Sequence, residues 1–383
     1  MKKHVSRITS LAALTLFVWG GVFAQQASMV NAPRKDPYLL LGTYTNGKSK
    51  GVYVYKFNTA TGDATAISYA ETTNPSFIAI SPDQKFVYAV NEDKGPGSVT
   101  SFAFDAKKGR LTEINKLPSE GESPCYVAVT KNGKFIAVAN YSSGTYAVYP
   151  VGPDGHIGAP VEKRADEGTG PNKDRQGKAH AHATIFSPDD KFLFVDDLGT
   201  DKIMLYHFDD ASGKLTPAQP PFVAVKPGSG PRHLVFDASH KFAYLITEMA
   251  GEVIAYAYNN GHFKEIQTIS SHPAGYKGQI GSADIHISPD GRFLYASNRG
   301  DANSIAIFKR DAATGKLALA DITSTKGVMP RNFNFDPSGN FLLVAHQASD
   351  DVVIFSVNRQ TGRLTDTGKR ISVGSPVCVQ WIR

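Results

Sequence analysis

The sequence contains little cysteine and tryptophan and, after its first 24 residues, no long apolar run. Its two cysteines cannot supply the several cross-links of a disulfide-stabilised scaffold. No apolar run beyond residue 24 approaches the roughly 18 residues that a membrane-spanning helix needs, so we predict no membrane span there. A long amphipathic helical pattern is also missing, which favours a protein built from strands.

The excess of basic over acidic residues is small. Lysine and arginine number 41, and aspartate and glutamate 35, which gives a net charge of +6. Lys2, Lys3 and Arg7 supply three of these charges within the first 24 residues, which contain no acidic residue. The remaining charge of about +3 is too small for the basic patch that nucleic-acid binding requires. We therefore predict no nucleic-acid partner.

The N-terminal segment has the order of features of an export signal. Its basic start is followed by an apolar stretch at 11–24, which ends on Ala24, a small residue suited to signal peptidase. An uncleaved membrane anchor is the alternative, but the stretch is shorter than a bilayer-spanning helix. We predict a signal peptide at 1–24, a linker at 25–37 and a folded domain at 38–383. The protein would then be exported, to the periplasm or outside the cell, and free of the membrane after cleavage.

A turn sequence recurs roughly every 50 residues, a period typical of propeller blades. Its six copies are SPDQKF at 81–86, TKNGKF at 130–135, SPDDKF at 187–192, DASHKF at 237–242, SPDGRF at 288–293 and DPSGNF at 336–341. Each copy lies between two short apolar runs of strand composition. A third run follows, and a fourth follows a Gly-Lys/Arg-Leu turn in four of the repeats. This pattern predicts four antiparallel strands per repeat.

The repeat count predicts an all-β fold, a seven-bladed β-propeller. First strands begin near residues 75, 124, 181, 231, 283, 330 and 376, and the last of these is followed by no further strand. Two strand-like segments at 38–44 and 51–57 have no first strand of their own. We predict that these N-terminal strands complete the C-terminal blade and close the ring without a free edge.

One segment, 150–179, lengthens the repeat and is rich in glycine, proline and charge. Such a segment is either a solvated loop or a rim over a site. The second interpretation rests on its place just before the His-Ala-His sequence at 180–182.

Polar residues that depart from the repeat pattern gather at one predicted end of the central channel. The start of each first strand and the end of the antiparallel second strand lie at the same face of the ring. This places around one channel mouth His180, His182, Arg232, His233, Glu248, Asp284, His286, Arg299 and Arg331. Because a guanidinium matches a carboxylate or phosphate in shape, the three arginines predict an anion site. We expect Arg232 and Arg299 to be partly solvated there, so that their substitution leaves the fold intact.

Structural roles compete with functional ones at several of these positions. His233 and His286 fit a structural role equally well. Residues at the ends of second strands are more typical of turns and caps, namely Asn91, Asn140 and Asn298, with Asp196, Asp197 and Asp201 as similar cases. His180 and His182 are two apart in a strand and resemble a metal pair, but spacing identifies no carboxylate to complete a site, so we predict no metal.

The two cysteines are predicted to be unpaired. Cys125 follows its strand-start proline by one residue and Cys378 by two, so their side chains face opposite sides of their strands. They also belong to repeats that are not neighbours in the ring.

The sequence resembles the lactonase family of seven-bladed propellers, of the 6-phosphogluconolactonase and carboxymuconate cyclase type. The motifs that carry the resemblance are LGTYT at 41–45, GVYVY at 51–55, NPS at 74–76, SPCY at 123–126, HAH at 180–182, GPRH at 230–233, SNRG at 297–300 and PRNF at 330–333. The resemblance extends from residue 38 to the C-terminus. With two tryptophans and no repeated Trp-Asp pair, the chain does not fit the WD40 class.

The resemblance implies a carboxylic-ester hydrolase that opens a lactone ring. Its active site combines a histidine, a glutamate and two arginines, which correspond here to His182, Glu248, Arg232 and Arg299. We expect His180, Arg331 and His286 to contact the substrate, a sugar-acid lactone held by its anionic group. No cofactor is predicted, and nothing indicates a particular oligomeric state. A lactonising cyclase and a non-catalytic exported binding module are the alternatives.

Overall fold

The computed structural model describes residues 1–2, 36–93 and 95–383. The predicted signal peptide and linker therefore lie almost entirely outside the described residues. From Asp36 onward the described chain forms one compact unit of strands and turns. In this part of the chain there is no helix with the length and apolarity needed to cross a membrane.

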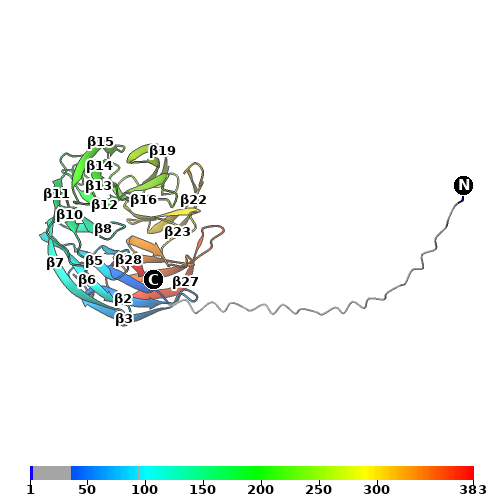
Figure 1. Cartoon of the computed structure of the whole chain (residues 1–383), viewed down its shortest axis with the longest axis horizontal. Helices are drawn as coiled ribbons and strands as arrows, with labels where there is room; N and C mark the ends of the chain where they lie inside the picture. The colour runs from blue at the N-terminus through cyan, green and yellow to red at the C-terminus, as the bar shows by residue number, and fades with distance from the viewer. Residues whose placement is uncertain (3–35, 94) are drawn as a thin grey trace. The chain divides into compact units, whose positions relative to one another are not determined.

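Seven four-stranded antiparallel sheets form the blades of a propeller (Figure 1). The first three comprise β28 (Pro376–Ile382), β1 (Tyr38–Thr43), β2 (Gly51–Phe57) and β3 (Ala64–Glu71); β4 (Ile78–Ile80), β5 (Phe86–Asn91), β6 (Pro96–Asp105) and β7 (Arg110–Glu122); and β8 (Pro124–Val129), β9 (Phe135–Asn140), β10 (Thr145–Pro150) and β11 (Glu162–Ala165).

The remaining four blades repeat this order from the channel to the rim, as β12 to β15 show in Figure 1. They comprise β12 (Ala181–Phe186), β13 (Phe192–Asp197), β14 (Lys202–Phe208) and β15 (Leu215–Ala224); β16 (Pro231–Phe236), β17 (Phe242–Thr247), β18 (Glu252–Asn259) and β19 (His262–Ser270); β20 (Ser282–Ile287), β21 (Phe293–Asn298), β22 (Ser304–Arg310) and β23 (Leu317–Ser324); and β24 (Pro330–Phe335), β25 (Phe341–His346), β26 (Asp351–Val357) and β27 (Leu364–Ser372).

The predicted closure of the ring is confirmed. The C-terminal strand β28 pairs with β1, with Leu39 opposite Trp381 and Leu41 opposite Val379. One blade thus contains both ends of the folded unit, and the pairing leaves no open edge between the first and last blades.

The recurring turn sequence has a direct structural reason. Its first residue is Ser, Thr or Asp, and the side-chain oxygen accepts a hydrogen bond from the backbone N–H of the phenylalanine five residues later. The six bonds measure 2.7–3.1 Å, as from Phe341 to Asp336 (2.7 Å) and from Phe135 to Thr130 (3.1 Å). The turn therefore joins first and second strands in the same way in all six repeats.

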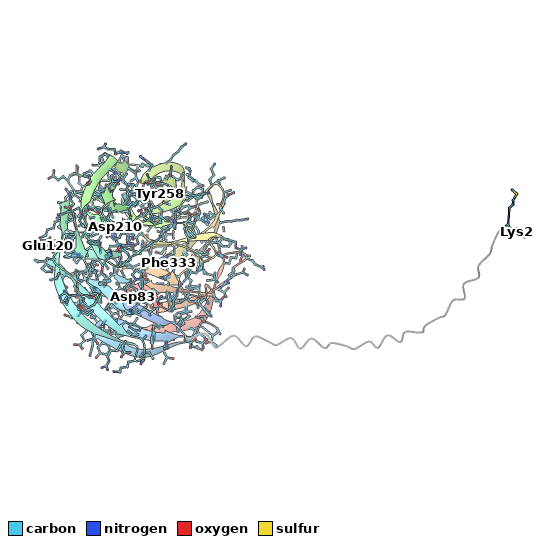
Figure 2. All side chains as sticks on the ribbon, viewed as in Figure 1. Lys2, Asp83, Glu120, Asp210, Tyr258 and Phe333 are labelled. Carbon is cyan, nitrogen blue, oxygen red and sulfur yellow. The ribbon has the colours of Figure 1, made fainter. Side chains whose placement is uncertain are left out.

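The core consists of seven apolar clusters, each shared by two adjacent blades. Side chains of alternate residues on each strand face one neighbour or the other, because successive residues of a strand point to opposite faces. Figure 2 shows the labelled Phe333 near the middle of the ring and Glu120 at its edge. This packing fixes the inner strands, on which the candidate site residues His182, Arg232 and Arg331 lie.

The segment at 150–179 is only partly an insertion. It contains β11, the fourth strand of its blade, which pairs with β10 from Thr145 to Val148. The strand was not predicted, because this blade lacks the Gly-Lys/Arg-Leu turn that precedes the fourth strand in four other repeats. The segment between β11 and β12 remains as an added connection beside the channel.

Candidate active site at one mouth of the channel

A β-bulge near the start of the first strand turns one residue out of the pairing in each of four blades. Cys125, His182, Arg232 and Arg331 are the second residues of β8, β12, β16 and β24, and each has no partner on the second strand. A bulge leaves its extra residue unpaired and redirects the side chain. The bulges therefore give one functional side chain per blade at the same height of the channel.

A second repeated position faces the same mouth. The residue directly after the second strand donates its backbone N–H to a carbonyl just before the first strand, as Tyr141 does to Ser123, Glu248 to Gly230 and Arg299 to Gly281. Glu92 makes the corresponding bond to Asn74. These bonds hold the chain beside the bulge and place the second set of side chains next to the first.

The two sets of residues surround a cavity of about 190 Å³. It is lined by Glu92, Cys125, Tyr141, Arg175, His182, Glu248, Arg299 and Arg331. The predicted residues His182, Glu248, Arg299 and Arg331 are thus brought together. Arg232 contacts Glu248 but is not among the lining residues.

Glu248 lies at the centre of an arginine cluster. Its Oε2 accepts a hydrogen bond from Arg232 Nε at 3.0 Å and forms an ion pair with Arg299 Nη2 at 2.8 Å, whereas Oε1 accepts a hydrogen bond from Arg175 Nη2 at 2.5 Å. Burial alone would raise the pKa of this carboxyl, but the positive charges, chiefly those of Arg299 and Arg232, outweigh burial and hold the pKa well below its usual value. Glu248 is consequently ionised at neutral pH.

His182 is a buried, uncharged imidazole beside this carboxylate. Burial, together with the charge of Arg232, holds its pKa well below the ordinary value for histidine. Nε2 lies 4.0 Å from Glu248 Oε2, which is too long for a direct hydrogen bond. The ring also packs edge-on against Tyr141. The neutral nitrogen at the cavity wall is therefore available to accept a proton.

Arg232 departs from the expectation of partial solvation, because it is only 1% exposed. Its Nη1 donates to the Ala283 carbonyl at 2.6 Å, and this bond holds the guanidinium behind Glu248. Burial and the charges of Arg299 and Arg331 lower the pKa of Arg232 to about 10. Arg232 thus contacts Glu248 but does not line the cavity, whereas Arg299 does.

A second arginine–carboxylate group forms another side of the cavity. Arg331 Nη2 lies 3.7 Å from Glu92 Oε2, and its guanidinium lies over the ring of Tyr44. Tyr44 donates to Glu92 at 2.8 Å, and burial raises the pKa of this phenol, so that it remains a donor. Four arginines against two glutamates leave an excess of positive charge at this mouth.

The histidines predicted to contact substrate lie elsewhere. His286 is bonded to Asp284 at 3.0 Å and lines a separate channel cavity of about 230 Å³. It is the fifth residue of β20, so its strand carries it about 10 Å further from the mouth than the second residue. His233 is bonded to the other oxygen of Asp284 at 2.8 Å. His180 stacks on Tyr141 and bonds its carbonyl, and does not line the mouth cavity.

The sequence reasoning missed Arg175 and Cys125 as lining residues. Cys125 shares the bulge position with His182, so the repeat alignment contained the signal. Burial raises the pKa of its thiol, which donates to the His182 carbonyl at 3.2 Å and is therefore a thiol and not a thiolate. Arg175 lies in the added segment between β11 and β12, where no repeat position exists to reveal it.

Most of the residues assigned to turns and caps behave as predicted. Asp197 accepts from the backbone N–H groups of His180, Gly199 and Thr200, and Asp201 accepts from those of Gly228 and Gly230. Asn91 and Asn298 are buried and donate to carbonyls of the loops beside them, and the buried Asn140 donates to the Ser119 carbonyl of β7.

Asp196 is the exception among these turn and cap residues, because neither of its oxygens has a partner among the described residues. It precedes the last residue of β13, a position that is apolar in four other blades, so it faces the packing between blades and not the turn.

Two further expectations concern the cysteines and a metal. Cys125 and Cys378 are both free and buried, as predicted. Within the described residues, no group of three or more His, Cys, Asp or Glu side chains has the arrangement of a metal site.

The comparisons with known proteins all give similarity to lactonases. The family profile described as "Lactonase, 7-bladed beta-propeller" matches residues 38–381. A 6-phosphogluconolactonase of Bacillus subtilis is 38% identical over 348 residues, which are 89% of this chain and 97% of the relative. One of Formosa agariphila is 38% identical over 353 residues, or 89% and 98% of the two chains. The solved structure of a periplasmic gluconolactonase of Pseudomonas aeruginosa has a TM-score of 0.87 and 39% identity, covering 91% of this chain and 99% of its own.

Proposed function

The chain belongs to the lactonase family of seven-bladed β-propellers, and we propose that it is a lactone hydrolase that opens a sugar-acid lactone in the mouth cavity. The observation that carries the proposal is the pairing of a neutral imidazole, His182, with an arginine-bound carboxylate, Glu248, at the wall of a cationic cavity. Ester hydrolysis needs these functions: a base for water, and positive groups where oxygen becomes negative.

In the proposed reaction, Nε2 of His182 removes a proton from the water that attacks the lactone carbonyl carbon. The tetrahedral intermediate then collapses with cleavage of the ring C–O bond, and the imidazolium returns its proton to the departing alkoxide. The products are a hydroxyl group and a carboxylic acid, which releases its proton to solvent. One histidine thus serves both proton transfers.

Glu248 fits the role of an orienting anion better than that of a proton donor. A general acid must carry a proton, and the arginines hold the pKa of Glu248 well below its usual value. Its charge fixes Arg299 in the cavity wall and stabilises the imidazolium that forms on His182, 4.0 Å away. Arg299 then stabilises the oxyanion, while Arg232 acts through Glu248 as a positioning residue.

The names of the relatives narrow the substrate class. The two relatives cited are 6-phosphogluconolactonases and the solved structure is a periplasmic gluconolactonase. We infer a six-carbon sugar-acid lactone. The sequence at 1–24 and the periplasmic relative support export of the protein. N-terminal sequencing of the protein recovered from cell fractions tests this location, and an intact Met1 in the cytoplasm would contradict it.

A panel of substrates tests the function. Purified protein is given 6-phosphogluconolactone, gluconolactone and an unsaturated dicarboxylate, and proton release or uptake is followed in a pH-stat against the uncatalysed rate. Glu248→Gln serves as the inactive reference. Proton release from a lactone supports the proposal. Ring closure of the dicarboxylate would replace it with a lactonising cyclase, and no turnover of any compound would favour a binding module.

A further inference from the structure

Four arginines surround the mouth, but they are held in different ways. Arg232 and Arg299 are fixed by backbone carbonyls as well as by Glu248: Arg232 by Ala283, and Arg299 by Gly281 and Ser282. Among the residues that the structure describes, Arg175 has no such backbone acceptor. Its guanidinium bonds Glu248 Oε1 at 2.5 Å and the Tyr141 hydroxyl at 3.3 Å. The Arg175 side chain is 44% exposed, against 12% for Arg299 and 2% for Arg232.

The backbone beneath Arg175 is fixed, so that only its side chain is free to change partner. The adjacent Gln176 is buried and donates to the Leu198 carbonyl at 2.9 Å. The Gly170 N–H donates to the Gln176 carbonyl, and the Arg175 N–H to Asn172 Oδ1. These bonds tie the segment into a closed turn beside the channel and hold the Cα of Arg175 at the rim.

The two carboxylate oxygens of Glu248 contact different arginines. Oε2 contacts Arg232 and Arg299, whereas Oε1 contacts Arg175, and no other described arginine is paired with that oxygen. If Arg175 leaves, the fixed pair still keeps the carboxylate charged, while Oε1 becomes free to accept a bond from a substrate hydroxyl. Once it has left Glu248, the Arg175 guanidinium can bind an anionic group of the substrate.

We propose that Arg175 is a specificity-determining residue, which exchanges Glu248 for a second anionic group on the substrate, a phosphate or carboxylate at the end of the sugar remote from the lactone. The proposal rests on the proposed lactonase function and adds the residue that selects charged over uncharged lactones. A planar guanidinium binds either anion with two parallel hydrogen bonds, so the chemistry is shared by both groups.

The first test compares substrates that differ only in the remote group. The ratio of kcat/KM for 6-phosphogluconolactone to that for gluconolactone is measured in the wild type, Arg175→Gln and Arg175→Lys. Lys173→Gln is the matched control, since it removes a positive charge from the same segment at an exposed position. Glucarolactone, which carries a carboxylate in place of the phosphate, distinguishes the two anions.

We expect Arg175→Gln to lower the ratio by about 10- to 100-fold, mainly through KM, because charged hydrogen bonds to the remote anion are lost. Arg175→Lys should restore part of the ratio, and Lys173→Gln should leave it at the wild-type value. An equal loss on both lactones would assign Arg175 a purely structural role and overturn the proposal, as would an unchanged ratio.

A second test does not depend on turnover. Calorimetry gives the affinities for 6-phosphogluconate and gluconate, and their quotient isolates the contribution of the phosphate. Arg175→Gln should reduce this quotient by about tenfold or more. If the wild type opens no lactone but the quotient falls as expected, the lactonase function fails and the anion site stands. If lactones are hydrolysed and the quotient is unchanged, the function stands and Arg175 is not the selective residue.

Discussion

Glu248 and Asp196 are buried carboxyls at the ends of second strands in adjacent blades, yet their pKa values are shifted in opposite directions. Arginines hold the pKa of Glu248 well below its usual value, whereas burial raises the pKa of Asp196 well above it. Glu248 forms ion pairs with three guanidiniums, whereas Asp196 accepts no hydrogen bond from any described residue. The difference shows that partners, and not burial, decide whether a carboxyl in this channel is ionised.

The position within the strand explains why the two residues have such different surroundings. Glu248 follows the last residue of β17 and turns toward the mouth, beside the bulged arginine of its own blade. Asp196 stands one place before the end of β13, where four other blades carry Val90, Ala139, Ile246 and Ala345. A shift of two residues separates the polar mouth from the apolar packing between blades.

Neutralising Glu248 should have the largest effect, since it makes this site resemble Asp196. We expect Glu248→Gln to lower kcat/KM by about 1,000-fold or more. It should also lower the free energy of unfolding by about 3 kcal/mol, because the buried Arg232 loses its carboxylate. The sequence predicts a partly solvated Arg232 and therefore no loss of stability at this site, but Arg232 is buried. Lactone assays and urea denaturation measure both effects.

The matched control is Glu120→Gln, which removes a carboxylate paired with Lys163 away from the mouth. A partly exposed pair contributes up to about 1 kcal/mol, so activity should be preserved and stability nearly so. Wild-type activity in Glu248→Gln would remove the carboxylate from the mechanism.

His182→Ala tests the neutral base that lies beside the ionised carboxylate. We expect kcat to fall by about 100- to 10,000-fold, the usual contribution of general acid–base catalysis. His156→Ala, at an exposed position of the same chain, should leave kcat unchanged. Steady-state kinetics at equal folded concentration would contradict the assignment if His182→Ala turned over at the wild-type rate.

Replacing Arg299 and Arg232 by lysine should distinguish Arg299, which lines the cavity, from Arg232, which does not. Arg299→Lys and Arg232→Lys should each lower kcat/KM by about 10- to 100-fold, because lysine loses the planar fork. Only Arg232→Lys should also cost stability, by about 2 kcal/mol, since an ammonium cannot reach both Glu248 and the Ala283 carbonyl. Equal melting temperatures for the two variants would contradict the burial of Arg232 as the deciding difference.

Asp196→Asn should stabilise the protein, in contrast to Glu248→Gln. A carboxyl whose folded pKa is raised binds its proton more tightly in the folded state, so stability falls as pH rises above the unfolded value of about 3.9. The variant removes this loss, and its advantage should grow as the pH rises above the unfolded value, by up to about 1.4 kcal/mol per pH unit. Asp197→Asn, whose carboxylate is fully bonded, should be destabilising instead. Denaturation at several pH values checks both, and an advantage that shrank with pH would reverse the sign of the argued shift.

The smallest expected effect is a shift in the pH at which kcat/KM falls on the acid side. Because the pKa of His182 is lowered, the imidazole stays unprotonated to acidic pH, and the limb of kcat/KM should lie below pH 6.5. A limb above pH 6.5 would show that Glu248 dominates the imidazole and that the arginines do not neutralise its influence.

The sequence alone predicted the blade count, the closure of the ring and the face at which functional groups gather. These follow from local chemistry: a Ser, Thr or Asp that caps a turn, and the alternation of strands. His182, Glu248, Arg299 and Arg331 were found because each breaks the repeat at a defined position. The burial of Arg232 could not be predicted, since it depends on the carbonyl of Ala283 in the next blade.

Sequence thus determined the repeated units and their polar ends, because hydrogen bonds within about six residues specify them. The tertiary structure alone decided three other features: that His286 lies too deep to reach the mouth, that Asp196 meets no donor, and that Arg175 reaches Glu248 from the connection between β11 and β12. Each depends on which blades become neighbours and how far each strand runs along the channel, and these distances exist only once the ring has closed.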